Sequence, residues 1–239
     1  MIRMQSLKVG LVSSSQLSFP GDKKSVYEAS AQKLRALSGQ LGFELYVHPG
    51  TVITPDDGYA AVKALEGEGV DFILLQCTSF SAGALAPIFA RARAALGLWA
   101  IPEHADRGVL PFNSFCTINM YSGIIGHYLK DYNIPIKWFF GDVEDPLFRG
   151  RLAVTVRALR AIKNLKASKV ALIGGIAPGF DDLYDDERTL IRRFDGIRIN
   201  RLHEYSEVRD RAVAYSAAQV AAEMERIAAE AGGVLNRRA

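Results

Sequence analysis

The sequence predicts an α/β protein with a doubly wound, mostly parallel sheet, followed by the start of a second α/β domain. Short apolar runs rich in β-branched residues alternate with stretches of helical periodicity, and the loops between them are short. The strongest run, 70–77, is almost continuously apolar, as expected for a central parallel strand that is buried on both faces.

The first strand is predicted at 8–13, and a polar loop follows it over 14–22. Ser25 and Glu28 have the spacing of a capping box, which predicts the start of a helix. Gly42 is expected to end that helix, because glycine readily adopts the left-handed conformation of a C-terminal cap.

The second unit repeats this order, with a strand at 43–48 and a helix after it. Thr54 in front of Pro55 predicts the helix start, because threonine caps and proline fits the first helical turn. The central strand at 70–77 comes next, and a helix is expected over 81–96.

The alternation continues with a strand at 98–101, a helix at 123–132 and a strand at 136–140. A long helix is predicted to open at Asp145 and Pro146. Parallel strands need such helical crossovers, which are right-handed, so we expect a flavodoxin-like or Rossmann-like strand order.

The domain boundary is placed near Leu165, giving a first domain at 1–165 and a second at 166–239. The second domain is predicted to hold two strands and two helices, at 169–174, 185–194, 197–201 and 213–231. A two-stranded sheet is marginal alone, so we expect this part to be the beginning of a longer central domain.

Composition excludes several classes of partner. The formal net charge is +3 among 239 residues, and the basic side chains form no stripe with interleaved aromatics, so no nucleic-acid partner is expected. The sequence has no run of about 18 uninterrupted apolar residues, so no membrane span is predicted. The two cysteines lack C-x-x-C spacing, which favours a reducing, cytoplasmic location.

Polar side chains gather where the predicted strands end, in the loops 13–22, 76–81 and 103–106. Ligands of open parallel sheets bind beyond these ends. Hydroxyl and amide groups both donate to and accept from sugar hydroxyls, so the loops suit polyol binding. The alternative is that these side chains only cap turns and helices.

No catalytic residue and no metal ligand is predicted within the chain. The four histidines are scattered and lack the spacing of a metal site. Cys77 ends an apolar strand and is expected to be a packed, slowly reacting thiol.

Four motifs in order resemble the N-terminal and central domains of the L-fucose/L-arabinose isomerase family. They are Gly10-Leu-Val-Ser13 with Gln16-Leu17, Gln76-Cys-Thr-Ser-Phe-Ser81, Leu110-Pro-Phe-Asn-Ser114, and Lys169-Val-Ala-Leu-Ile-Gly174 leading to Pro178-Gly-Phe-Asp181. The likeness spans essentially the whole chain and rests on the order and spacing of the motifs.

The resemblance implies an aldose–ketose isomerase of carbohydrate metabolism, in which Mn²⁺ acts as a Lewis acid on an open-chain monosaccharide. It places the metal ligands beyond this chain, and it implies homo-oligomers whose first domain closes a neighbour's active site. The positions that match this role here are around Gln16, Leu17 and Asn113. Together with Thr78 of the polar loop 76–81, they are the predicted substrate-binding residues. Arabinose isomerases carry a histidine where Ser114, Phe115 and Cys116 follow the asparagine, so the sugar is left open.

Two other hypotheses stay open. A stand-alone sugar-binding or regulatory module would need no metal ligands. A racemase-like enzyme would use Cys77 and Cys116. A reading frame that continues beyond Ala239 into a Glu and Asp pair and a later His would favour the isomerase.

Overall fold

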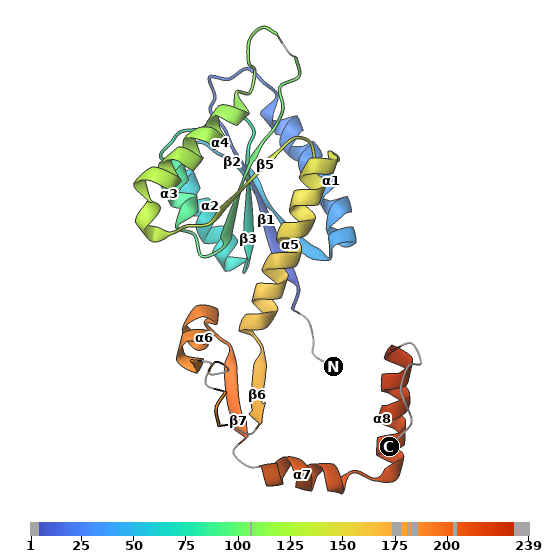
Figure 1. The fold of residues 1–239 in the computed structure, drawn as a ribbon. Helices are drawn as coiled ribbons and strands as arrows, with labels where there is room; N and C mark the ends of the chain where they lie inside the picture. The colour runs from blue at the N-terminus through green and yellow to red at the C-terminus, as the bar shows by residue number, and fades with distance from the viewer. Residues whose placement is uncertain are drawn as a thin grey trace. The chain divides into compact units, whose positions relative to one another are not determined.

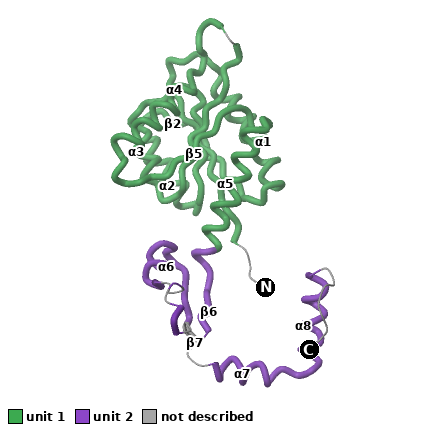
Figure 2. The backbone as a smooth tube through the Cα atoms, in the orientation of Figure 1, with its two compact units in different colours: residues 1–164 green, residues 165–239 purple. Residues whose placement is uncertain are grey.

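The computed structural model describes residues 5–105, 107–173, 178–180, 182, 186–202 and 205–231. The chain divides into two compact units, residues 1–164 and residues 165–239, coloured separately in Figure 2. Each unit is described by itself.

The first unit contains a five-stranded sheet in which every pairing is parallel. Its order is β2-β1-β3-β4-β5, which confirms the doubly wound prediction and the flavodoxin-like order (Figure 1). The strands are β1 (Leu7–Ser14), β2 (Phe43–Val52), β3 (Phe72–Cys77), β4 (Ala95–Ala100) and β5 (Ile136–Phe140).

Helices cover both faces of this sheet: α1 and α5 lie on one face and α2, α3 and α4 on the other (Figure 1). They are α1 (Lys23–Leu41), α2 (Pro55–Gly67), α3 (Leu85–Ala90), α4 (Ser114–Gly123) and α5 (Pro146–Lys166), with a π-helical turn at Ile124–Tyr128 and a 3-10 turn at Lys130–Tyr132. Within the described chain, no helix is both long and apolar enough to cross a bilayer.

Two apolar clusters hold the layers together, one on each face of β3. On the first face, Leu34 of α1 and Phe148 of α5 pack with Leu74, and on the other face Leu65 of α2 and Phe89 of α3 pack on the same strand. Burying each such side chain contributes about 1.5–3 kcal/mol. All six residues of β3 are buried, as its continuous apolar run predicts.

The crossovers leave the sheet in opposite directions at its centre. The chain passes from β1 through α1 on one face to β2, whereas it passes from β3 through α3 on the other face to β4. The carboxyl ends of the neighbouring strands β1 and β3 therefore form the switch point at which doubly wound folds bind their ligands.

The first two helices start where a polar side chain caps the backbone. Thr54 and Asp57 form a complete capping box at α2, as predicted. The cap of α1 is Asp22, whose carboxylate accepts from the backbone N–H of Ser25 at 3.1 Å, so the predicted box of Ser25 and Glu28 is wrong. The two patterns overlap in sequence, and the earlier acidic residue supplies the cap.

Two other helix predictions need correction. The helix predicted over 81–96 is only α3, since Ala95 and Leu96 pair with Phe72 and Ile73 in the sheet. The helix predicted over 123–132 starts earlier, at Ser114, and continues as the π-helical and 3-10 turns.

The second unit has a parallel two-stranded sheet of β6 (Lys169–Ile173) and β7 (Arg198–Leu202). Its helices are α6 (Glu187–Phe194), α7 (Tyr205–Ala214) and α8 (Ala217–Glu230). The single helix predicted over 213–231 is interrupted, because Ser216 and Gln219 form a capping box that begins α8. Residues 174 and 185, predicted to bound a strand and a helix, lie outside the described residues. That the unit belongs to a longer domain stays a prediction.

Candidate functional site

Buried hydroxyl groups fill the switch point between β1 and β3. The parallel register pairs Ser13 with Gln76 and Ser14 with Cys77, so the residues that follow both strands meet at one edge. The hydroxyl side chains buried there are Ser13, Ser14, Ser15, Thr78, Ser79, Ser81, Ser114 and Thr117.

These hydroxyls bond to one another in a directed chain. The Thr51 hydroxyl donates to Ser13 Oγ at 3.2 Å, and the Thr78 hydroxyl donates to the carbonyl of Ser14 at 3.1 Å. The 2.8 Å bond between Ser13 Oγ and Thr78 Oγ1 must then run from Ser13 to Thr78. The donors of this chain are committed inside the protein, where each bond contributes about 0.5–1.5 kcal/mol.

A second set of bonds ties the start of α4 to the ends of β3 and β4. The Ser114 hydroxyl donates to the carbonyl of Cys77 and accepts from the backbone N–H of Ile101 at 3.0 Å. Thr117 Oγ1 accepts from the backbone N–H of Ser81, also at 3.0 Å. Backbone groups beyond the ends of these strands have no partner in the sheet, and the side-chain hydroxyls supply their hydrogen bonds.

The structure places the four predicted sugar-binding residues in different environments. Gln16 and Leu17 are exposed at the tip of the loop after β1, and Asn113 is half-buried at the start of α4. Thr78, in contrast, is fully buried within the hydroxyl network. Thr78 therefore belongs to the buried network, whereas the other three residues lie at or near the surface of this edge.

Glu103 fixes the conformation of Asn113. Its carboxylate accepts from the backbone N–H of Asn113 at 2.5 Å and from that of Phe112 at 3.2 Å. Asn113 has a φ of 49°, in the left-handed region that asparagine tolerates better than most residues, and its side chain makes no capping bond to α4. Glu103 was predicted only as part of a polar loop, and Asp106 of that loop lies outside the described residues.

Hydrogen bonds connect the three loops of this edge in pairs. The backbone N–H of Gln16 donates to Ser79 Oγ at 3.1 Å, which joins the loops after β1 and β3. The N–H of Gly21 donates to the carbonyl of Pro111 at 3.0 Å, and that of Phe80 donates to the carbonyl of Phe112 at 2.6 Å. The loops after β1, β3 and β4 therefore form one continuous surface.

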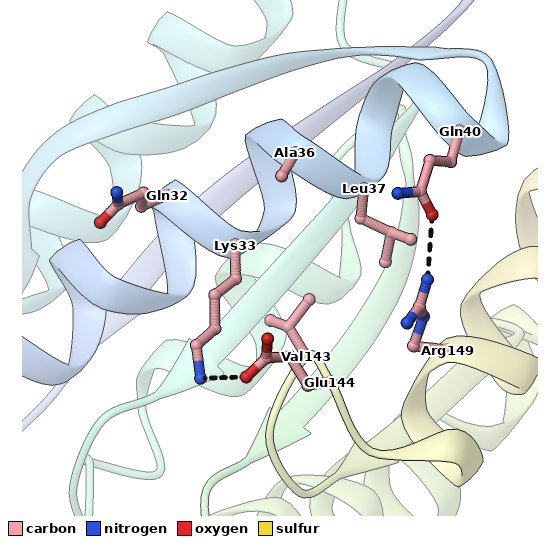
Figure 3. A pocket seen from close by; sticks show the side chains of 8 residues that line it. All are labelled: Gln32, Lys33, Ala36, Leu37, Gln40, Val143, Glu144 and Arg149. Atoms are coloured by element: carbon pink, nitrogen blue, oxygen red, sulfur yellow. Dashed lines mark hydrogen bonds and ion pairs between the residues drawn. The ribbon is translucent and has the colours of Figure 1, made fainter.

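A cavity of about 400 Å³ lies away from this edge, between α1 and the start of α5 (Figure 3). Its polar side chains bond to one another, since Lys33 Nζ lies 3.0 Å from a Glu144 carboxylate oxygen and Arg149 donates to the side-chain carbonyl of Gln40 at 2.9 Å. Its lining residues are Gln32, Lys33, Ala36, Leu37, Gln40, Val143, Glu144 and Arg149.

Cys77 is fully buried, which confirms that it is a packed thiol. Burial raises the pKa of this thiol to about 12, although a hydrogen bond with Ser14 lowers it. The thiolate that a nucleophile requires is therefore scarce at neutral pH, which argues against the racemase-like hypothesis for Cys77.

We expect a thiol reagent to modify one cysteine per native chain, the exposed Cys116. Mass-spectrometric labelling checks this, with Cys116→Ser as the control that removes the fast reaction. Rapid labelling of Cys77 in the folded Cys116→Ser protein would contradict the packed-thiol assignment.

Among the residues that the structure describes, no three His, Cys, Asp or Glu side chains are grouped to hold a metal ion. No family model matches the chain, and no curated protein matches it.

Proposed function

We propose that this chain forms the substrate-facing part of a cytoplasmic aldose–ketose isomerase that acts on a monosaccharide. The observation that carries the proposal is the continuous surface of the three loops, which presents the Gln16 side chain and the nearby Asn113 at the switch point. A side-chain amide both donates to and accepts from sugar hydroxyls. The order of the motifs that resemble the isomerase family supports the same function.

The proposal includes a homo-oligomer in which this edge closes a neighbouring active site. Large apolar side chains on these loops are exposed, with Leu17 at 76% and Val109 at 81%. Leu110, on the loop after β4, and Phe115, in the first turn of α4, are also exposed. Such apolar surface is typical of interaction sites.

The described residues do not fit a catalytic Mn²⁺ site, because they offer no cluster of ligands. We therefore assign no step of the reaction to a metal held by this chain. In the proposed enzyme, the metal would polarise the carbonyl and hydroxyl oxygens of the sugar from ligands outside these residues.

We expect this 239-residue chain to show no turnover of aldoses, with or without Mn²⁺, while it still binds a monosaccharide. Chromatographic detection of the ketose tests turnover, and calorimetry tests binding. Turnover by these residues alone would contradict the proposal that the catalytic groups lie outside these 239 residues. If the full-length protein binds a monosaccharide but does not isomerise it, the hypothesis of a stand-alone sugar-binding module is favoured.

A further inference from the structure

The cavity between α1 and the start of α5 contains a guanidinium group that forms no ion pair within the described residues (Figure 3). Arg149 belongs to the first turn of α5, and its Nη2 donates to the side-chain oxygen of Gln40 at 2.9 Å. Because Gln40 is neutral, the positive charge of Arg149 stays unbalanced. An arginine side chain has five N–H donors, and this bond uses one of them.

Lys33, the other cation of the cavity, is in contrast already paired. Its Nζ lies 2.9 Å from a carboxylate oxygen of Asp142 and 3.0 Å from one of Glu144. The hydrogen bonds with Asp142 and Glu144 raise the pKa of Lys33, so its ammonium group stays charged at neutral pH. Two carboxylates share this one ammonium group, and they repel a further anion. An anionic ligand is therefore expected at the Arg149 end of the cavity.

The lack of an acidic partner for Arg149 follows from the sequence of its own helix. α5 carries basic residues along its length and no acidic residue. Two other arginines of α5 are held by neutral groups: Arg151 lies 4.2 Å from the centre of the Trp138 ring, and Arg160 donates to the carbonyl of Gly42 at 3.2 Å. Arg149, unlike these two, lines the cavity, where a ligand can reach its charge.

Gln40 adds further donors beside this charge. Its Oε1 accepts from Arg149, which leaves the two N–H groups of its Nε2 without a partner in the described part of the chain. Both side chains are exposed, so a ligand can reach these donors. A carboxylate has two acceptor oxygens, and it can therefore accept from a guanidinium and an amide together.

The rest of the cavity suits a short aliphatic group. Its volume is about 400 Å³, within the range of roughly 300–1,000 Å³ that is typical of small-molecule sites. Leu37 and Val143 are buried and close its inner side, whereas Ala36 is exposed in its lining. An aliphatic group can pack on Ala36 and on the methylene groups of Gln32 and Lys33.

We propose that this cavity binds a small aliphatic carboxylate. The carboxylate accepts from Arg149 and Gln40, and the aliphatic part lies along Ala36. One unbalanced guanidinium matches one negative charge, which favours a carboxylate over a phosphate group with its charge of about −1.5 to −2. None of the four residues predicted to bind sugar lines this cavity, so the site does not depend on the proposed isomerase function.

An NMR titration of the 239-residue chain at neutral pH tests the site, with hexanoate as the probe. We expect backbone amide signals of α1 and of the start of α5 to shift and to reach saturation. Hexanamide, which has no charge, should bind at least about tenfold more weakly, a difference of about 1.4 kcal/mol. Inorganic phosphate, which has no aliphatic part, should also bind at least about tenfold more weakly.

Arg149→Gln should weaken hexanoate binding at least about tenfold and leave the melting temperature nearly unchanged, because Arg149 is exposed. Arg157→Gln is the matched control, since Arg157 is an exposed arginine of the same helix that does not line the cavity. It should bind hexanoate as the wild-type protein does. Ala36→Leu keeps the charge of Arg149 but fills the space beside it, so it should weaken binding to a similar extent.

Four results would overturn the proposal. Hexanoate gives no saturable shift, or hexanamide or phosphate binds as well as hexanoate. Folded Arg149→Gln or Ala36→Leu retains full affinity, or Arg157→Gln loses as much affinity as Arg149→Gln.

Discussion

Replacing Glu103 with alanine is expected to lower the free energy of unfolding by about 1.5–3 kcal/mol. The carboxylate accepts from two backbone N–H groups, of Phe112 and Asn113, and hydrogen bonds to charged groups are the stronger kind. Because Glu103 is half-buried, water compensates part of the loss, so the expected cost is that of one such bond rather than two.

Urea denaturation measures this change, and Glu144→Ala is the matched control. Glu144 is also an acidic residue of the first unit, but 73% of its side chain is exposed in an ion pair with Lys33. A surface pair of this kind is worth about 0–1 kcal/mol. Equal effects of the two substitutions would contradict the anchoring role of Glu103.

Loss of this anchor should also weaken sugar binding, because Asn113 would no longer be held at its positive φ. Glu103→Gln should fall between the wild-type protein and Glu103→Ala, since its side chain keeps only one acceptor oxygen.

Thr78→Val is expected to lower the free energy of unfolding by about 1–3 kcal/mol. Valine nearly preserves the shape of threonine but removes the hydroxyl, which leaves the buried Ser13 hydroxyl without its acceptor. The carbonyl of Ser14 loses a bond as well. In the folded variant, sugar affinity should change little, because Thr78 is fully buried.

Thr51→Val is the control for Thr78→Val, since Thr51 also bonds Ser13 Oγ but is only half-buried. Water can replace its hydroxyl, so thermal and urea denaturation should show a smaller loss. A Thr78→Val protein as stable as wild type would contradict the structural role of the hydroxyl network. One that is stable and unable to bind sugar would restore Thr78 as a direct ligand contact.

The sheet could be predicted from sequence because its signal is local and repeated. The continuous apolar run of β3 indicates burial on both faces, and the alternation of strands and helices leaves few possible strand orders. The end of α3 could not be predicted in this way. Ala95 and Leu96 suit a helix by local pattern, and only their pairing with β3 makes them a strand.

The location of the candidate site could be predicted from the sequence, but the role of each of its residues could not. The sequence places hydroxyl residues after β1 and β3, yet the same composition fits exposed ligand contacts and an internal network. Tertiary contacts decide between the two. The Ser13–Thr78 bond joins the end of β1 to the end of β3, and the Glu103 carboxylate binds the backbone of Asn113, ten residues further along the chain.

The most direct test of the proposed sugar-facing edge compares the wild-type protein with Gln16→Ala, measuring the affinity for the monosaccharide that it is proposed to bind together with the melting temperature. Gln16 is exposed, and its backbone N–H, which the substitution retains, makes the bond to Ser79. We predict that sugar binding weakens by about 1–3 kcal/mol while the melting temperature stays nearly unchanged. Unchanged affinity, or unfolding with no separate effect on the sugar, would contradict the assignment of this edge as the sugar-binding surface.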